Sequence, residues 1–290
     1  MAEAELQNAH LSTINPDFAT LVPAVDAAFK QIWTYNDLTE FRGNWRNSAP
    51  IYASIIPTEG FDISHQNITV SDQTKIEIRL FTPQGVPNSD LPLLFVLHGG
   101  GWVVGGHDSE ASICRLACVR NRTKVLSVDY RRAPEHRFPC ALNDSYDVFQ
   151  WAVTHSTQLG IDREKIVLFG TSSGANLTAA LALKLRDSQN TVRVAGQILN
   201  VPVTCHPKHF PSHKIELNSY EQNAESPTTN ATHMRWFWDQ YYPNASADPL
   251  ASPLLAESHA NLPPTLIQVA GLDPLRDEGI AYAKVLKDAG

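Results

Sequence analysis

The spacing of apolar residues changes along this chain, and each spacing predicts a different element. Between residues 18 and 46 apolar side chains, several of them aromatic, recur at helical intervals, which predicts amphipathic helices. In the segments NITVSD (67–72) and TKIEIRLFTP (74–83) apolar and polar residues alternate instead, which is the pattern of half-buried strands. The chain therefore begins with helices and changes to strands from about residue 60.

Further along, almost continuously apolar segments alternate with helical patterns. The apolar segments, which have the composition of strands buried on both faces, are LPLLFVLHGG (91–100), TKVLSVDYR (123–131), KIVLFG (165–170), VRVAGQILNVPV (192–203) and PTLIQVAG (264–271). The helical patterns are CALNDSYDVFQWAVTHSTQLG (140–160), ANLTAALALKLRD (175–187) and LRDEGIAYAKVLKDAG (275–290). Strands that alternate with helices predict an α/β protein with a mostly parallel central sheet flanked by helices.

Two stretches do not fit this alternation, the N-terminal helices and residues 206–247. The second is polar, contains prolines and ends in the aromatic segment HMRWFWDQYY (233–242). Because ligands of such folds bind beyond the carboxyl ends of the strands, we expect both stretches to form a helical cap there. The expected parts are 1–50 (cap), 51–205 (core), 206–247 (cap insertion) and 248–290 (core).

Composition and charge exclude several classes of protein. With 290 residues, 43% of them hydrophobic and 18% charged, the chain fits one large globular domain or one domain with an insertion. The formal net charge of −7 argues against a nucleic-acid partner, which requires a broad basic face. No segment approaches the ~18 apolar residues of a membrane span, and the first residues lack a signal-peptide pattern. We therefore expect a cytoplasmic protein.

The cysteines indicate neither a disulfide framework nor a metal site. The spacing of Cys114, Cys118, Cys140 and Cys205 fits no zinc pattern, and a chain of this length needs no disulfide for stability. We expect reduced thiols and no metal.

The segment GTSSG, residues 170–174, follows an apolar strand and precedes a helix. This is the context of the nucleophile elbow G-x-S-x-G, in which the central serine exposes its hydroxyl at a sharp turn. The register selects Ser172 as the nucleophile. Ser173 then begins the helix, where its backbone N–H faces an anion placed beside Ser172. The alternative is that small residues close the turn for packing alone.

A second motif, HGGGW at residues 98–102, directly follows the strand LPLLFVL. Consecutive glycines expose backbone N–H groups without shielding side chains, and such a loop forms half of the oxyanion hole in lipases and esterases. The alternatives are a flexible turn or a phosphate cradle, but a phosphate loop would continue with Lys-Ser/Thr. We expect His98, at the end of a buried strand, to be a structural residue rather than the catalytic base.

A third motif, GLDPLRDEG at residues 271–279, follows the strand PTLIQVA. Asp273 lies just past the end of that strand, which places its carboxylate on the same rim as the elbow. Asp277 and Glu278 fall in the first turn of the next helix, where acids are common without any catalytic role. Ser before Asp before His is the chain order of this type of hydrolase.

Together these motifs resemble the hormone-sensitive-lipase-like branch of the α/β-hydrolases, from about residue 60 onward. The segments that carry the resemblance are HGGGW (98), VDYRRAPEHRFP (128), GTSSG (170), MRWFWDQYY (234), ASPL (251) and LPPTLIQVAGLDPLRDEG (262). It implies an α/β-hydrolase fold with a helical cap and a carboxylesterase that needs no cofactor. It also implies a nucleophile at Ser172, an acid at Asp273 that orients the base, and an oxyanion hole from Gly100, Gly101 and Ser173.

Two features depart from the family's usual pattern. The elbow serine is flanked by Thr171 and Ser173 where the family commonly has Asp and Ala; because both are small, we expect the elbow to be retained. The family's triad histidine follows one more strand, and AKVLKDAG (283–290) stops where that strand should begin. Three explanations are open: a histidine beyond Gly290, a naturally short protein without ordinary hydrolysis, or substitution by another subunit or by the cap histidines. Those cap histidines are His206, His209 and His213.

The function expected from these features is hydrolysis of small to medium, apolar or aromatic esters. Aromatic side chains suggest a substrate pocket, although they could equally serve only to attach the cap; they are Trp33, Trp45, Trp102, Trp236, Phe237 and Trp238. The alternative is a non-hydrolytic relative, either a small-molecule binding protein or a lyase or dehydratase. An unpaired PTLIQVA strand would be an apolar edge, so we also consider a homodimer.

Overall fold

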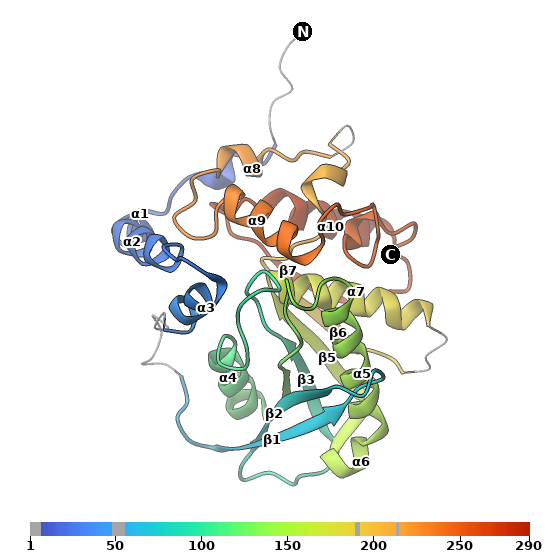
Figure 1. Cartoon of the computed structure of the whole chain (residues 1–290). Helices are drawn as coiled ribbons and strands as arrows, with labels where there is room; N and C mark the ends of the chain where they lie inside the picture. The colour runs from blue at the N-terminus through green and yellow to red at the C-terminus, as the bar shows by residue number, and fades with distance from the viewer. Residues whose placement is uncertain (1–6, 48–55, 189–191, 213–214) are drawn as a thin grey trace.

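The computed structural model describes residues 7–47, 56–188, 192–212 and 215–290, and its centre is a mixed β-sheet (Figure 1). The strands are β1 (Phe61–Thr69), β2 (Lys75–Pro83), β3 (Leu91–Leu97), β4 (Lys124–Val128), β5 (Ile161–Thr171), β6 (Gly196–Asn200) and β7 (Thr265–Gln268). Their order in the sheet is β1-β2-β4-β3-β5-β6-β7. Pairing is antiparallel from β1 to β4 and parallel from β4 to β7, so the predicted mostly parallel sheet is confirmed.

Helices cover both faces of the sheet, because side chains along a strand point alternately to opposite faces. On β3, Leu94 and Val96 pack with Cys114 and Cys118 of α4. Phe95 points the other way and contacts the ring of Phe149 on α5, 5.6 Å away. Figure 1 shows α4 on one side of the sheet and α5 and α7 on the other. The helices of the core are α4 (Ala111–Asn121), α5 (Cys140–Thr154), α6 (Ser156–Leu159), α7 (Ser173–Asp187) and α10 (Arg276–Asp288).

Helix α4 is not predicted by the apolar pattern. Only Cys114 and Cys118 of this helix are buried, so it has a narrow apolar face with no large aliphatic side chain to mark its period. The long pattern at 140–160 is divided at Thr154 into α5 and α6, and it ends as predicted at Gly160, whose φ of 66° is left-handed.

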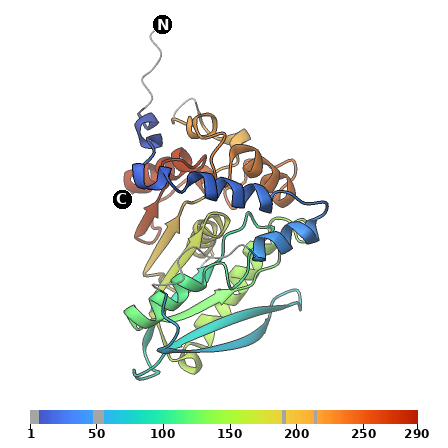
Figure 2. The same cartoon turned by 90° about the vertical axis from the view of Figure 1, so that its left-hand side faces the viewer.

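The N-terminal helices and residues 206–247 lie together at one end of the sheet (Figures 1 and 2). Their helices are α1 (Pro16–Ala19), α2 (Val22–Ile32), α3 (Leu38–Asn47), α8 (Ser219–Gln222) and α9 (Ala231–Tyr241), and short 3₁₀ turns span Ala9–Ser12, Pro207–His209 and Pro253–Leu255. Trp33, at the end of α2, stacks on His233 of α9 with ring centroids 3.7 Å apart. This contact joins the two stretches predicted to form the cap, whereas the predicted boundary near residue 50 lies outside the described residues.

None of the helices in the described part of the chain has the length and hydropathy needed to cross a bilayer.

Candidate active site

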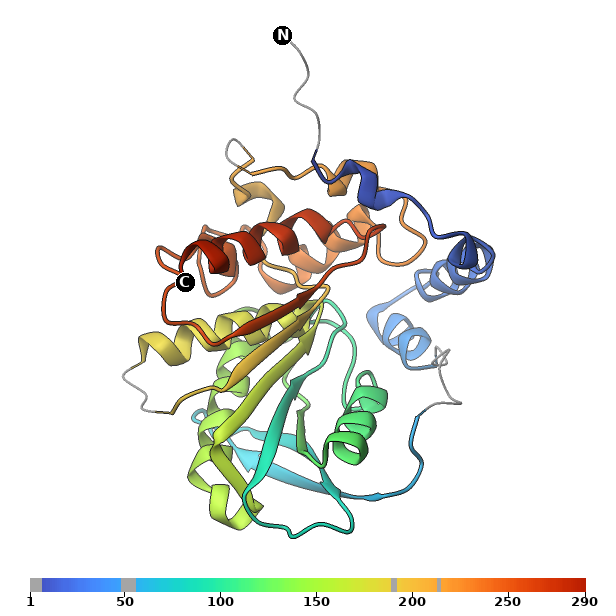
Figure 3. The same ribbon diagram turned by 180° about the vertical axis from the view of Figure 1, so that it is seen from behind.

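The predicted catalytic segments emerge at the same edge of the sheet. In the parallel register Leu97 of β3 lies beside Gly170 of β5, Thr171 beside Asn200 of β6, and Asn200 beside Gln268 of β7. These residues are at or next to the carboxyl ends of their strands, which run side by side in Figure 3. The loops that carry HGGGW, Ser172 and Asp273 therefore leave the sheet at the edge where ligands bind in open α/β folds.

Ser172 occupies a strained turn between β5 and α7. Its backbone has φ 54° and ψ −117°, a conformation that costs a non-glycine residue on the order of 1–3 kcal/mol and persists only where the surroundings enforce it. The glycines on either side allow the close packing that holds this turn. A Cβ on Gly170 would collide with the carbonyl of Gly174, and one on Gly174 with the carbonyl of Leu97. Ser173, by contrast, is the buried first residue of α7. Of the two serines, Ser172 is the one at the apex.

The HGGGW loop has the conformation that its glycines allow. Gly100 and Gly101 have φ of 122° and 57°. A Cβ on Gly100 would meet the carbonyl of Val104, and one on Gly101 would fall on the ring of Phe237 from α9. Within the described residues, the N–H groups of Gly100 and Gly101 donate no hydrogen bond. They are thus free to bind an anion.

Ser173 adds a third free donor. As the first residue of α7 it lies among the positions whose N–H groups have no partner inside the helix, and in the part of the chain described its N–H donates to no backbone carbonyl.

Glu110 connects the HGGGW loop to the turn that carries Ser172, and this residue was not predicted from the sequence. Its Oε1 accepts a hydrogen bond from Gly99 N–H at 3.2 Å, and its Oε2 accepts one from Thr171 Oγ at 3.1 Å. The side chain is buried, and burial raises the pKa of the Glu110 carboxyl to about 7. The threonine that departs from the family's usual elbow is therefore used as a donor to this carboxyl group.

We expect Glu110→Gln to change how stability depends on pH. The folded pKa lies above the ordinary value of 4.5, so the folded chain binds more protons than the unfolded chain between pH 4.5 and about 7. The contribution of Glu110 to stability falls as pH rises through that window and stays low above it. Glutamine cannot ionise, so the variant should gain up to about 3 kcal/mol relative to wild type between pH 4.5 and 8.

Urea unfolding at several pH values checks this, with the exposed Glu257→Gln as the control variant. Comparison of variant with wild type removes the contributions of other buried carboxyl groups. A constant stability difference across the pH range would contradict the prediction.

His98 is a structural residue in this fold, as expected. Its ring is fully buried and stacks on Tyr130, with centroids 4.1 Å apart. Its Nδ1 hydrogen-bonds to Gly99 O at 2.8 Å, and Tyr130 donates its hydroxyl to His98 O at 2.6 Å. Burial lowers the pKa of His98 to about 4. The ring therefore stays neutral and holds the strand end that precedes the glycines.

Arg42 of α3 is a second residue that the sequence did not reveal. Its guanidinium donates to Val103 O at 3.0 Å and to Ala133 O at 2.9 Å, and it pairs with both oxygens of Glu135 at 2.7 Å. Ala133 N–H in turn donates to Trp102 O at 2.9 Å. Arg42 thus ties helix α3 to the residues that follow the HGGGW glycines, both directly at Val103 and through the segment Ala133–Pro134–Glu135.

Asp273 lies in the turn between β7 and α10. Its Oδ1 accepts a hydrogen bond from Leu275 N–H at 2.8 Å, and Asn223 donates to its backbone carbonyl at 3.0 Å. Burial raises the pKa of Asp273 to about 6. Asp277 and Glu278 are instead used structurally: Asp277 accepts from the N–H of Ser219 at 2.8 Å, and Glu278 accepts from that of Thr204 at 2.6 Å.

Four of the five tryptophans predicted to line a pocket divide into two pairs. Trp102 and Trp238 are fully buried and contact each other, with ring centroids 4.7 Å apart. Trp33 and Trp236 are half-buried and meet edge to face at 5.5 Å, where α2 contacts α9. The first contact joins α9 to the HGGGW loop, and the second joins α2 to α9. A role of these side chains in binding substrate stays a prediction.

The histidines that were considered as substitute bases have other partners. His206 Nδ1 accepts from Lys208 N–H at 3.1 Å, and His209 Nε2 hydrogen-bonds to Ala245 O at 2.7 Å. His213 lies outside the described residues. Among the residues that the structure describes, no histidine is hydrogen-bonded to Ser172 Oγ. One surface hollow is lined by the far end of α7 and by residues 248–250 and 256–258, so it is not part of this site.

Comparison with known proteins places this geometry among ester hydrolases. A family model described as alpha/beta hydrolase fold matches residues 94–290. The chain is 33% identical over 288 residues to the ethyl acetate hydrolase of Pseudomonas putida, covering 96% of this chain and 87% of that enzyme. A crystal structure of vibralactone cyclase is similar with a TM-score of 0.88 at 31% identity, covering 100% of this chain and 87% of that one. The hyperthermophilic esterase of the archaeon Pyrobaculum calidifontis has a TM-score of 0.80 at 30% identity, over 96% and 86% of the two chains.

Proposed function

Because the chain belongs to the α/β-hydrolase fold family and is a carboxylic ester hydrolase, we propose that its reaction proceeds through an acyl-enzyme on Ser172. The observation that carries this proposal is the strained backbone of Ser172 at the apex of a strand-to-helix turn. Such strain is retained where it exposes a nucleophile.

The proposed first step is attack of Ser172 Oγ on the ester carbonyl. The new C–O bond forms as the carbonyl oxygen becomes an oxyanion, which accepts hydrogen bonds from the free N–H groups of Gly100, Gly101 and Ser173. The imidazole of a histidine that is not among the described residues would take the serine proton and give it to the alcohol as the ester C–O bond breaks. A water molecule would then hydrolyse the acyl-enzyme in the same way. Asp273 is the acid that orients this imidazole. Burial raises the pKa of Asp273 because it disfavours the charged carboxylate. A neighbouring imidazolium would stabilise that carboxylate, so the two groups should bind each other strongly.

The proposed substrates are small to medium esters with apolar or aromatic groups. The half-buried indoles of Trp33 and Trp236 support this class, because they are aromatic surface on the cap segments. The comparisons do not favour the non-hydrolytic alternative, a binding protein or a lyase. Turnover of p-nitrophenyl acetate and butyrate by the wild type and by Ser172→Ala tests the proposal.

We also propose a homodimer in the cytoplasm. All four cysteines are free thiols, which supports a reducing compartment. Within the described residues β7 is the last strand of the sheet, and its Leu266 is 56% exposed. Pairing of β7 with β7 of a second copy would cover this edge. Light scattering over a concentration series should show the dimer, and a monomer at every concentration would contradict it.

A further inference from the structure

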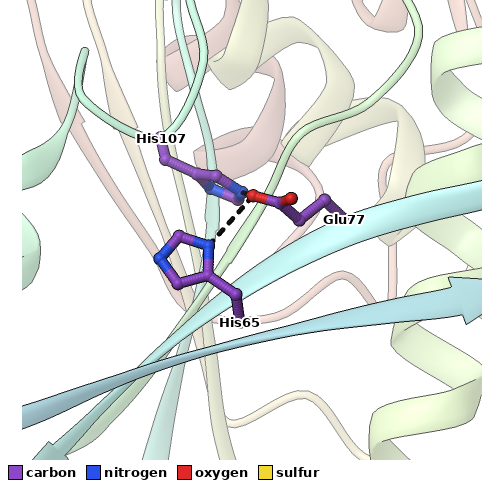
Figure 4. A group of neighbouring side chains, drawn as sticks. All are labelled: His65, Glu77 and His107. Carbon is purple, nitrogen blue, oxygen red and sulfur yellow. Dashed lines mark hydrogen bonds and ion pairs between the residues drawn. The ribbon is translucent and has the colours of Figure 1, made fainter.

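Three potential metal ligands from separate segments meet beside the β1–β2 hairpin (Figure 4). His65 is on β1 and Glu77 on β2, while His107 belongs to the loop between β3 and α4. Their ligand atoms all lie within 4.8 Å of one another. Glu77 Oε1 is at the centre, 2.9 Å from His65 Nδ1 and 3.5 Å from His107 Nε2.

The sheet register explains why two of the three side chains are neighbours. Glu77 is paired with Asn67, and Arg79 with His65. His65 and Glu77 are therefore diagonal partners on the same face of an antiparallel pair, within reach of long side chains. His107 is brought to them from a part of the chain about thirty residues further on, so no local sequence spacing marks the group.

His107 supplies the second, independent observation. It is 7% exposed, and its Nε2 has no hydrogen-bond partner among the described residues although it is directed at Glu77. A buried polar atom left unpaired is costly. On the other side of the ring, Nδ1 hydrogen-bonds to Ser127 Oγ at 2.9 Å, the kind of contact that orients a metal-bound imidazole.

The surrounding charges leave one negative charge at the group. Arg79 pairs with Asp108 at 2.6 Å, and Arg132 pairs with Asp129. With these two pairs neutral, Glu77 is the uncompensated anion between two imidazoles. A divalent cation would neutralise the Glu77 carboxylate and would accept the lone pair of the unpartnered His107 Nε2.

We propose that His65, Glu77 and His107 form a binding site for a divalent transition-metal ion of the zinc class. Two imidazoles and a carboxylate suit zinc and its neighbours cobalt, nickel and copper, whereas calcium and magnesium prefer oxygen ligands alone. Three protein ligands leave a fourth position, which is open to water because the side chains of His65 and Glu77 are 44% and 45% exposed.

The geometry requires little movement to accept such an ion. Metal–ligand bonds of about 2.0–2.2 Å place tetrahedral ligand atoms about 3.4 Å apart. Glu77 and His107 already have this separation, at 3.5 Å. The exposed His65 ring must turn so that Nδ1 approaches His107 Nε2, which a surface side chain can do at small cost.

A bound ion would connect the hairpin to the loop that follows the glycines of the active site. Gly105, two residues before His107, is packed so closely that a Cβ there would collide with Gly99 O and His98. Arg132 also donates to the Gly105 carbonyl at 3.1 Å. Because the ion bonds to the folded chain and holds two of its segments together, it should raise the melting temperature.

Calorimetric titration of the untagged, chelator-treated protein with zinc chloride, together with melting curves with and without zinc, tests the proposal. The wild type should bind one ion per chain at this group and melt several degrees higher with zinc. His65→Gln, Glu77→Gln and His107→Gln should each weaken binding at least about tenfold and abolish the shift. Cobalt should give the visible absorption of a tetrahedral site in the wild type and not in these three variants.

The control is the double variant His206→Gln/His209→Gln, which removes a different pair of neighbouring imidazoles, 5.7 Å apart, and should leave the zinc shift unchanged. If the buried His107→Gln variant does not fold, the exposed His65→Gln variant still decides the question. If zinc does not raise the melting temperature of the wild type, His65, Glu77 and His107 form only a hydrogen-bonded cluster and the proposal is wrong. Binding that survives all three substitutions, or that disappears in the control, would equally overturn the proposal.

Discussion

Replacing Ser172 with alanine is expected to lower kcat/KM for p-nitrophenyl butyrate by at least about 10³-fold. The hydroxyl is the atom that forms the acyl bond, and no other group at the elbow can take its place. Ser173 is instead the buried first residue of α7. The structure of the loop should be unchanged, because alanine keeps the backbone atoms that bond to Asn200 O at 2.8 Å.

Ser173→Ala is the matched control for this substitution. Its proposed contribution is a backbone N–H, which alanine retains, so most of the activity should remain. A phosphonate ester gives a second readout, since it should label the wild-type peptide 165–181 at Ser172 and leave the Ser172→Ala variant unlabelled. Equal turnover by wild type and Ser172→Ala would contradict the proposed mechanism.

Replacing Gly101 with alanine should have the second largest effect, lowering kcat by about 10²–10³-fold, the loss typical of one oxyanion donor. Two causes act together. The φ of Gly101 is 57°, which disfavours any residue with a Cβ, and the added methyl group would collide with a ring carbon of Phe237. The loop must move to relieve this collision, and its free N–H groups then no longer point to the oxyanion.

Gly85→Ala separates the two causes experimentally. Gly85 also has a left-handed φ, 72°, but nothing lies within 4 Å of the position of its Cβ. This variant should lose a little stability and keep its kcat. Steady-state kinetics and melting curves of both variants make the comparison. Full kcat in Gly101→Ala would mean that this glycine does not position an oxyanion donor.

Sequence reasoning reached the sheet and the elbow because both depend on local patterns. The continuous apolar segment LPLLFVL is typical of a strand buried on both faces, and both faces of β3 are packed in the structure. The assignment of Ser172 over Ser173 depends on the register of two glycines, each of which has a neighbour that excludes a Cβ. Helix α4 was not predicted because its buried face consists only of two cysteines.

The amino-acid sequence by itself therefore determined the α/β-hydrolase class, the elbow, the glycine loop and the position of Asp273. Only the tertiary structure showed that Glu110 bonds to both Gly99 and Thr171, that Arg42 braces the glycine loop, and that His65, Glu77 and His107 meet. The physical reason is distance along the chain: these contacts join residues 11 to 93 positions apart. Their side chains have no periodic signature, so packing of the folded elements alone brings them together.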